Sequence, residues 1–289
     1  MPEFRWRRLS PFAMPEPHAP SNRIAEFFDR RAEDYDREYH EETPGGYALR
    51  VRREIVFRMF DLDGGRVLDV GCGPAVMTQP VLERGAEYWG VDVSARMIEI
   101  GQARFANDAR VHFAAGSATK LDFEAGFFDG VLCIGVIDSV PDPRQAVREM
   151  VRVLRPGGTL IVSVTNFCSP YAWWKNYVFY PLVSVWHRLR GALGDSTLKP
   201  GRIRSGSLRS LFTLAEAKRL FAAEGAPVCG TAGYYYNVLL SPLDEMTPGL
   251  ALRITRNLEE RRWPRPDWLA AGWILKARKP EEDSAPGSR

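Results

Sequence analysis

Apolar runs of strand length alternate with amphipathic stretches in the first part of the chain. The apolar runs cover residues 67–70, 87–93, 111–117, 128–136 and 159–166. The stretches between them include 76–84, 95–106 and 141–158, which have helical patterning. Short apolar runs are typical of buried strands, and strands that alternate with helices favour a parallel, doubly wound α/β sheet.

Capping residues predict where three helices begin. Ser94 precedes one helix, and Asp142 precedes another, which Pro156-Gly157-Gly158 should end. Thr213 and Glu216 have the spacing of a capping box before residues 215–226. Two later apolar runs, 228–240 and 272–279, should add two more strands to the sheet.

Composition and cysteine usage indicate an ordinary cytoplasmic globular protein. The chain has 289 residues, 45% of them hydrophobic, and so can bury a full core. The four cysteines show no paired spacing, so we expect neither disulfides nor a metal site. No run of 18 apolar residues exists, and residues 1–20 lack the apolar centre of a signal peptide. We expect a disordered leader over 1–20 and a disordered tail over 280–289.

Positive charge is concentrated in the second half of the chain. Residues 166–280 carry 17 Lys and Arg against 8 Asp and Glu, whereas residues 1–165 carry 21 against 25. A solvated surface explains this most simply, and peripheral contact with a membrane is the alternative. Because the arginines cluster in one loop and no nucleic-acid module is present, we expect no nucleic-acid partner.

A glycine turn, Gly71-Cys72-Gly73, follows the first apolar run. Glycine lets the backbone approach a ligand closely at the carboxyl end of a strand. The dinucleotide fingerprint requires a third glycine where this chain has Val76, and the G-K-[ST] ending of a P-loop is absent. A phosphate cradle is therefore disfavoured, and a Rossmann oxidoreductase remains only an alternative.

Four segments in order resemble the motifs of class I S-adenosylmethionine-dependent methyltransferases, in the subgroup of ubiquinone/menaquinone-type and natural-product small-molecule enzymes. They are "VLDVGCGPA", "GVDVS", "FDGVLCIGVIDSVPDP" and "LRPGGTLIVSV", and "IAEFFDRRAEDYDREY" is similar to the helical lid of that subgroup. The resemblance implies a Rossmann-like, mostly parallel seven-stranded sheet whose last strand is antiparallel. It divides the chain into a lid (21–60), a cofactor-binding core (61–166), an insertion (167–212) and a C-terminal part of the sheet domain (213–279).

The same resemblance implies roles in binding S-adenosylmethionine. Asp92 would accept hydrogen bonds from the two ribose hydroxyls. Two departures from the family pattern stand out: Ala75 replaces the third glycine, and Ser117 replaces an acid that binds the adenine amino group. The full predicted set comprises Asp69, Gly71, Cys72 and Gly73 on the methionine and ribose side, Asp92, Val93 and Met97, Ser117 and Ala118 at the adenine, and Cys133 and Ile134 beside the methionine part.

The catalytic group is less well defined by the sequence. Many relatives carry a histidine near the acceptor where this chain reads Asp138-Ser139. Asp138, His187 in the insertion and Tyr35 on the lid are the candidates, although an acceptor that ionises by itself needs no strong base. A non-catalytic protein that binds S-adenosylmethionine is therefore a further alternative.

The insertion begins with eight aromatic residues between positions 167 and 187, and a basic stretch follows over 188–209. Such residues can wall an apolar acceptor pocket, and the arginines can meet an anionic group. Alternatives are a helical hairpin packed on the core and an amphipathic helix lying on a membrane. Tyr39, Trp173, Trp174 and Tyr177 are the predicted substrate-binding residues.

Together these observations predict a small-molecule methyltransferase that acts by in-line displacement on an aromatic or amphiphilic acceptor, and the arginines allow that acceptor to be anionic. The sequence leaves open whether oxygen, nitrogen or carbon is methylated, and it leaves open the oligomeric state.

Overall fold

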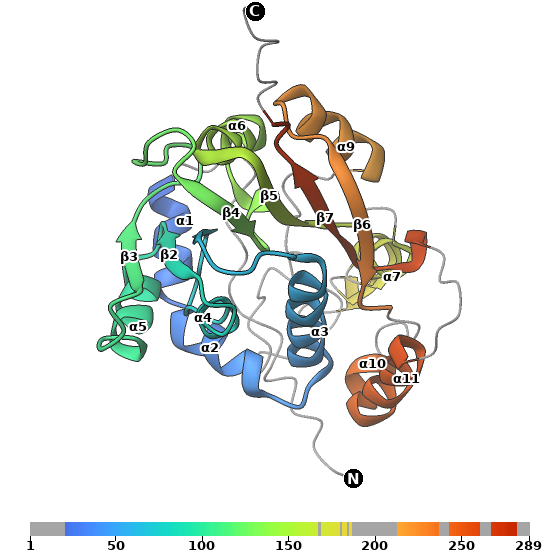
Figure 1. The fold of residues 1–289 in the computed structure, drawn as a ribbon. Helices are drawn as coiled ribbons and strands as arrows, with labels where there is room; N and C mark the ends of the chain where they lie inside the picture. Colours follow the sequence, from blue (N-terminus) through green and yellow to red (C-terminus); the bar gives the residue numbers. More distant parts are fainter. Residues whose placement is uncertain are drawn as a thin grey trace, which may run out of the picture.

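Seven strands form one sheet between layers of helices (Figure 1). The computed structural model describes residues 21–166, 169–179, 181–183, 185–186, 213–236, 243–260 and 267–281. The predicted leader, most of the predicted tail, and residues 187–212 of the insertion lie outside the described residues.

The order of the strands across the sheet is β3-β2-β1-β4-β5-β7-β6. β7 is antiparallel to both of its neighbours, while β1 to β5 pair in parallel. This confirms the predicted doubly wound sheet with an antiparallel last strand. The strands are β1 (Arg66–Val70), β2 (Glu87–Asp92), β3 (Val111–Ala115), β4 (Phe128–Cys133), β5 (Leu154–Thr165), β6 (Val228–Tyr234) and β7 (Gly272–Arg278).

Helices cover both faces of the sheet, α6 and α9 on one and α3, α4 and α5 on the other (Figure 1). The helices are α1 (Ser21–Asp29), α2 (Ala32–His40), α3 (Pro44–Met59), α4 (Thr78–Leu82), α5 (Ala95–Arg104), α6 (Pro143–Val153), α7 (Pro170–Trp174), α9 (Leu214–Ala223), α10 (Leu243–Met246) and α11 (Pro248–Glu260). Short helical turns are η1 (Ile137–Ser139), η2 (Lys175–Phe179) and η3 (Asp267–Leu269). Among the described residues, none of these helices combines the length and the apolar character needed to cross a bilayer.

Two separate cores follow from the alternation of side chains along the strands. Val67 packs on the α3–α4 side, whereas its neighbour Leu68 packs on the α6–α9 side. The same alternation holds in β5, where Leu160 and Ile161 belong to opposite cores. Successive strand residues point to opposite faces, so continuous apolar runs are needed to fill both layers.

The predicted helix caps are confirmed. Ser94 Oγ accepts a hydrogen bond from the Met97 amide at 3.1 Å, and Asp142 caps α6 in the same way. Thr213 and Glu216 form the reciprocal capping box. The helix expected over 76–84 is shorter than predicted and begins at Thr78, because the chain turns through a left-handed Ala75 (φ +63°) before it.

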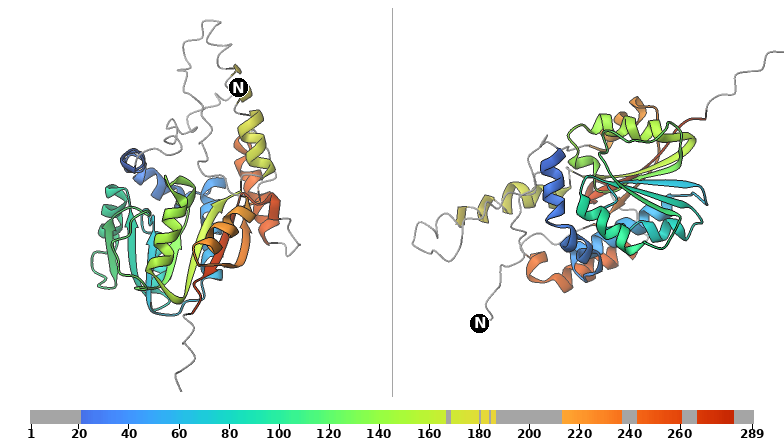
Figure 2. Two further views of the ribbon diagram at one scale, coloured as in Figure 1. Left: turned by 90° about the horizontal axis from the view of Figure 1, so that it is seen from above. Right: turned by 90° about the vertical axis from the view of Figure 1, so that its left-hand side faces the viewer.

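The N-terminal helices are fastened to the edge of the sheet where β1 and β2 end. Asp29 of α1 accepts a hydrogen bond from Ser94 Oγ at 2.6 Å, and Asp36 of α2 pairs with Arg104 of α5. At the other side of the molecule, α7 and the helical turns after it project from the body of the sheet domain (Figure 2).

Candidate functional site

The glycine turn after β1 folds back onto the end of β2. The Gly71 amide donates to the Val91 carbonyl at 2.6 Å, and the Gly73 amide donates to Asp92 Oδ2 at 2.9 Å. Both glycines are left-handed, with φ of +73° and +52°, a region that side chains disfavour.

Gly71 and Gly73 face different surroundings. A Cβ atom on Gly71 would overlap Val136 Cγ2, so this glycine is required for packing against the segment after β4. A Cβ atom on Gly73 would find no atom closer than Tyr35 Cε1 at 4.0 Å. Gly73 therefore borders open space, and it is the glycine whose missing side chain leaves room for a ligand.

Asp92 lies at the carboxyl end of β2 and uses one carboxylate oxygen for each of two backbone amides. Oδ2 binds the Gly73 amide and Oδ1 binds the Ser94 amide, each at 2.9 Å. Burial raises the pKa of Asp92, and the two backbone hydrogen bonds oppose that shift. Each carboxylate oxygen has a second lone pair, so the group is fixed in place and can still accept hydroxyl groups from a ligand.

A cavity of about 720 Å³, its open mouth included, lies beside this turn and Asp92. Ser117 and Ala118 after β3 form one wall, and Ile24 and Phe28 of α1 contribute apolar surface. The other lining residues are Tyr35, Gly71, Gly73, Val91, Asp92, Val93, Met97, Gly116, Ile134, Gly135, Val136, Ser139, Val140 and Pro141.

A second cavity of about 270 Å³ shares four lining residues with the first: Tyr35, Gly71, Gly73 and Ile134. The remaining lining residues are Tyr39, Asp69, Cys72, Pro74, Val76 and Met77. Asp69 is buried at the end of β1 and accepts a hydrogen bond from the Tyr88 hydroxyl at 2.8 Å. Burial, opposed by that hydrogen bond, raises the pKa of Asp69 to about 7.

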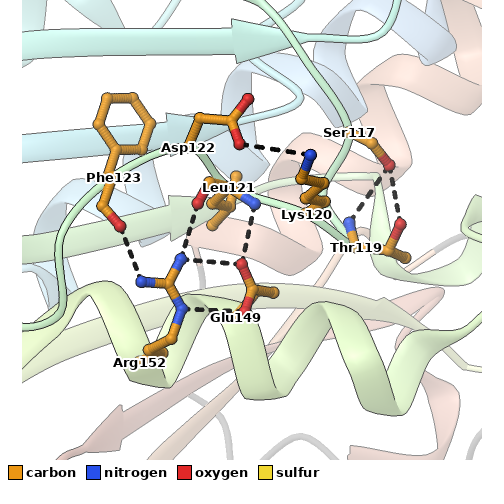
Figure 3. A network of polar contacts seen from close by, with 8 residues as sticks. All are labelled: Ser117, Thr119, Lys120, Leu121, Asp122, Phe123, Glu149 and Arg152. Carbon is orange, nitrogen blue, oxygen red and sulfur yellow. Dashed lines mark hydrogen bonds and ion pairs between the residues drawn. The ribbon is translucent and has the colours of Figure 1, made fainter.

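The loop that carries Ser117 and Ala118 is fixed to α6 by a polar network (Figure 3). Arg152 donates to the carbonyls of Leu121 and Phe123, both at 2.7 Å, and Glu149 accepts from the Leu121 amide at 2.9 Å. Ser117 Oγ is hydrogen bonded to Thr119 Oγ1 at 2.9 Å. The wall of the cavity is thus held in position, and the Ser117 hydroxyl already has a neighbour in the loop.

A buried polar cluster lies next to the two cavities. Asp138 Oδ2 accepts hydrogen bonds from the amide and the hydroxyl of Thr165, the last residue of β5, at 3.0 and 2.6 Å. Arg52 of α3 donates from Nη2 to the Tyr39 hydroxyl at 3.2 Å. Burial raises the pKa of Asp138 to about 6, against the lowering effects of the Thr165 hydrogen bonds and of the Arg52 charge. We name these four residues (Arg52, Asp138, Tyr39 and Thr165), together with Tyr234 at the end of β6, the Arg52–Asp138 cluster.

Most of the residues predicted to bind the cofactor border these cavities. Cys133 differs, because it is fully buried on the α6 side of the sheet and is absent from both linings. Of the predicted acceptor residues, Tyr39 borders the second cavity, whereas Trp173, Trp174 and Tyr177 border neither. Trp173 and Tyr177 are 57% and 54% exposed. His187 lies outside the described residues.

Sequence reasoning missed Arg52, Tyr234 and the α1 side chains of the wall. Arg52 carried a readable signal, because it lies three and four residues before the buried Ile55 and Val56, on the apolar face of α3. A charged residue in that position is buried on folding, and buried charges need a partner or a ligand.

Comparison with known proteins agrees with this geometry. The family model described as "Methyltransferase domain" matches residues 68–162. Residues of this chain are 33% identical over 118 positions to a ubiquinone biosynthesis O-methyltransferase of Xanthomonas oryzae pv. oryzae, covering 40% of this chain and 49% of that protein. A demethylmenaquinone methyltransferase of Renibacterium salmoninarum is 34% identical over 140 positions, covering 48% of this chain and 57% of that protein.

The chain carries a class I S-adenosylmethionine-dependent methyltransferase domain. This confirms the predicted family and cofactor for the matched part of the chain. The crystal structure of a cyclase, SpnF, shares the fold with a TM-score of 0.62 and 19% identity, covering 93% of this chain and 99% of that one. The chain spans about half the length of the curated relatives that it matches.

The residues at the site suit S-adenosylmethionine. Asp92 offers a fixed carboxylate for a ribose diol, and Gly73 leaves space above the turn. Val93 and Met97 provide apolar surface for a flat adenine ring. Asp69 lines the smaller cavity, and a ligand's positive charge beside it would favour its ionised form. Within the described residues, no group of three or more His, Cys, Asp and Glu side chains has an arrangement that could hold a metal ion.

Proposed function

We propose that this chain transfers a methyl group from S-adenosylmethionine to a small acceptor with an aromatic or amphiphilic body. The observation that carries the proposal is the meeting of Asp92, Gly73 and Tyr35 around one cavity. The relatives named above act, by their names, in quinone biosynthesis, which supports an aromatic acceptor. The matched domain argues against the oxidoreductase alternative, as does Val76 in place of the third glycine.

S-adenosylmethionine, when bound, supplies a methyl group already activated on a sulfonium. The protein's contribution is alignment of the acceptor, exclusion of water and acceptance of a proton. Asp92 and the glycine turn fix one end of the site. Ile24 and Phe28 of α1 cover the cavity with apolar side chains, so the N-terminal helices serve to exclude water.

Binding of S-adenosylhomocysteine, the reaction product, tests the assignment of Asp92. Asp92→Ala removes the carboxylate that would accept the ribose hydroxyls, and charge-assisted hydrogen bonds of this kind contribute about 2–3 kcal/mol. We expect the dissociation constant in calorimetry to rise by about 30- to 150-fold. Asp122→Ala, at an exposed position that lines neither cavity, is the matched control.

An unchanged dissociation constant in a folded Asp92→Ala protein would remove Asp92 from the site. Turnover is tested separately, with a labelled methyl donor and cell extract, and with the product identified by mass. Tight binding of S-adenosylhomocysteine without any methylated product would favour the non-catalytic alternative.

A further inference from the structure

The Arg52–Asp138 cluster contains two buried polar atoms that no described residue satisfies. Arg52 Nε and Asp138 Oδ1 have no hydrogen-bond partner, although both residues are only 8% exposed. Leaving such atoms unpaired inside a protein costs about 1–3 kcal/mol each, and more for charged groups. One cluster thus contains an unpaired donor and an unpaired acceptor. This indicates a ligand that accepts a hydrogen bond from the first and donates one to the second.

Arg52, Asp138 and Tyr234 line neither cavity themselves, but they adjoin residues that do. Tyr39, which accepts from Arg52, borders the smaller cavity, and Gly135, whose Cβ position would lie 3.0 Å from Arg52 Nη1, borders the larger one. Asp138 follows Gly135 by three residues. The charges of Arg52 and Asp138 both act on the pKa of Tyr234, Arg52 lowering it and Asp138 raising it. The cluster is therefore at the carboxyl ends of β4, β5 and β6, away from Asp92 at the end of β2.

The charges in the cluster discriminate between acceptor classes. Arg52 is a permanent cation whose described neighbours are tyrosine hydroxyls, and its charge acts on Asp138 without a direct ion pair between them in the described part of the chain. A neutral aromatic amine is a far weaker acid than a phenol, so it does not give up a proton to the Asp138 carboxylate. A hydroxyl group suits both open atoms, because its oxygen accepts from Arg52 Nε and its hydrogen donates to Asp138 Oδ1.

The geometry points to a phenol- or enol-type hydroxyl as the methyl acceptor, with Arg52 donating to its oxygen and Asp138 receiving its proton. This inference rests on the proposed methyl transfer and adds the acceptor class. As the O–H bond breaks, the proton moves to Asp138 Oδ1 and Arg52 stabilises the negative oxygen. The oxygen lone pair forms the bond to the methyl carbon, the electron pair of the broken carbon–sulfur bond stays on sulfur, and a neutral thioether leaves. Asp138 then returns the proton to water.

Matched pairs of hydroxyl and amino compounds test the acceptor class without turnover. The probes are 7-hydroxy-4-methylcoumarin with 7-amino-4-methylcoumarin, p-cresol with p-toluidine, and 1-naphthol with 1-naphthylamine. Each is titrated into the full chain saturated with S-adenosylhomocysteine. We expect at least one hydroxyl compound to bind tenfold or more tightly than its amine, and the bound hydroxycoumarin to absorb at the longer wavelength of its anion.

Variants separate a binding role from a structural one. Arg52→Gln should lose the preference for the hydroxyl and the spectral shift, while Asp138→Asn should lose the shift because it cannot take the proton. Arg52→Lys keeps the positive charge but loses the planar guanidinium and its Nε donor. This variant should fold, and it should bind the hydroxyl compound at least fivefold more weakly. Arg53→Gln on the same helix and Asp122→Asn are the matched controls, and both should behave as the unmodified protein.

Equal affinity for hydroxyl and amino probes, or an unchanged preference in Arg52→Lys and Arg52→Gln, would overturn the inference. So would the failure of every hydroxyl probe to bind while S-adenosylhomocysteine binds normally. Failure of the unmodified protein to bind S-adenosylhomocysteine would instead overturn the proposed function itself, and the inference with it.

Discussion

Gly71 and Gly73 belong to the same turn but are constrained by different neighbours. Both have left-handed backbone, which costs a non-glycine residue about 1–2 kcal/mol. At Gly71 a side chain would also overlap Val136, whereas at Gly73 it would point toward Tyr35 across open space. The first position is therefore needed for packing, and we propose that the second leaves space for the ligand.

This difference predicts opposite effects of two alanine substitutions. Gly71→Ala should lower the melting temperature strongly, and adding Val136→Ala should restore part of the loss by removing the clashing methyl groups. Gly73→Ala should lower the melting temperature only modestly but weaken S-adenosylhomocysteine binding by tenfold or more. Thermal melts and calorimetry on the three proteins measure both effects. Normal binding by Gly73→Ala would show that the ligand does not approach this side of the turn.

Asp69 makes the stability of the fold depend on pH. Its pKa is raised by burial from its ordinary value of 3.8 to about 7, so the folded state holds a proton that the unfolded state releases. The stability from this group is complete below about pH 4 and is lost as the pH rises through about 7. Three pKa units correspond to about 4 kcal/mol.

Asp69→Asn should remove this pH dependence while keeping an acceptor for the Tyr88 hydroxyl. Between pH 4 and pH 8, the free energy of unfolding of the unmodified protein should fall by about 4 kcal/mol relative to Asp69→Asn. Urea denaturation at several pH values measures the difference. Parallel pH curves for the two proteins would contradict the raised pKa, and Asp122→Asn serves as an exposed control.

At the scale of elements, the helical segment after β5 has more exposed aromatic surface than a packed hairpin would. Trp173 is 57% exposed, and its ring centroid is 6.0 Å from that of Tyr177, which is also exposed. Trp174 is partly buried. These observations disfavour packing as the main role of Trp173, and they leave acceptor binding and membrane contact as hypotheses.

Trp173→Ala should therefore change the free energy of unfolding by less than about 1 kcal/mol, well under the 3–5 kcal/mol of an emptied buried site. If this segment walls the acceptor pocket, Trp173→Ala and Trp174→Ala should lower kcat/KM for the acceptor and leave cofactor affinity unchanged. If it lies on a membrane, the same changes should reduce sedimentation with liposomes. A large fall in melting temperature for Trp173→Ala would restore the packing interpretation.

At the scale of the molecule, Arg104 joins three parts that are distant in sequence. It lies on α5, donates from Nη2 to both carboxylate oxygens of Asp36 at 2.9 Å, and donates from Nη1 to the Pro74 carbonyl at 2.7 Å. The guanidinium of Arg104 thus links α2 to the glycine turn, in addition to the contact between Asp29 and Ser94. A change there should alter how fast a ligand leaves.

Arg104→Ala should increase the dissociation rate constant of S-adenosylhomocysteine several-fold, because the N-terminal helices lose their tie to the turn. Asp36→Ala should have a similar effect, and the double variant should add little, as expected for one shared interaction. Stopped-flow displacement measures these rates, with Arg110→Ala on the outer surface as the control. Fully additive effects would mean that the two residues act independently.

The sequence by itself determined the elements, and it predicted the residues that we propose bind the cofactor. Ser94, Asp142 and Thr213 cap their helices through contacts within three residues, and such local hydrogen bonds are readable from spacing alone. The glycine turn was predictable because ligands bind at the carboxyl ends of the strands in a parallel sheet, whereas the role of Asp92 was implied by the resemblance to the methyltransferase family.

Tertiary structure decided the rest. Arg52, Asp138 and Thr165 come together from α3, η1 and β5, and only the packing of those elements leaves Arg52 Nε and Asp138 Oδ1 buried without a partner among the described residues. Likewise, position 71 requires glycine because a side chain there would overlap Val136, which is 65 residues later in the chain. Local pattern fixes which residues form strands and helices, whereas the distances between side chains of different elements depend on how the layers pack, and no spacing along the chain records them.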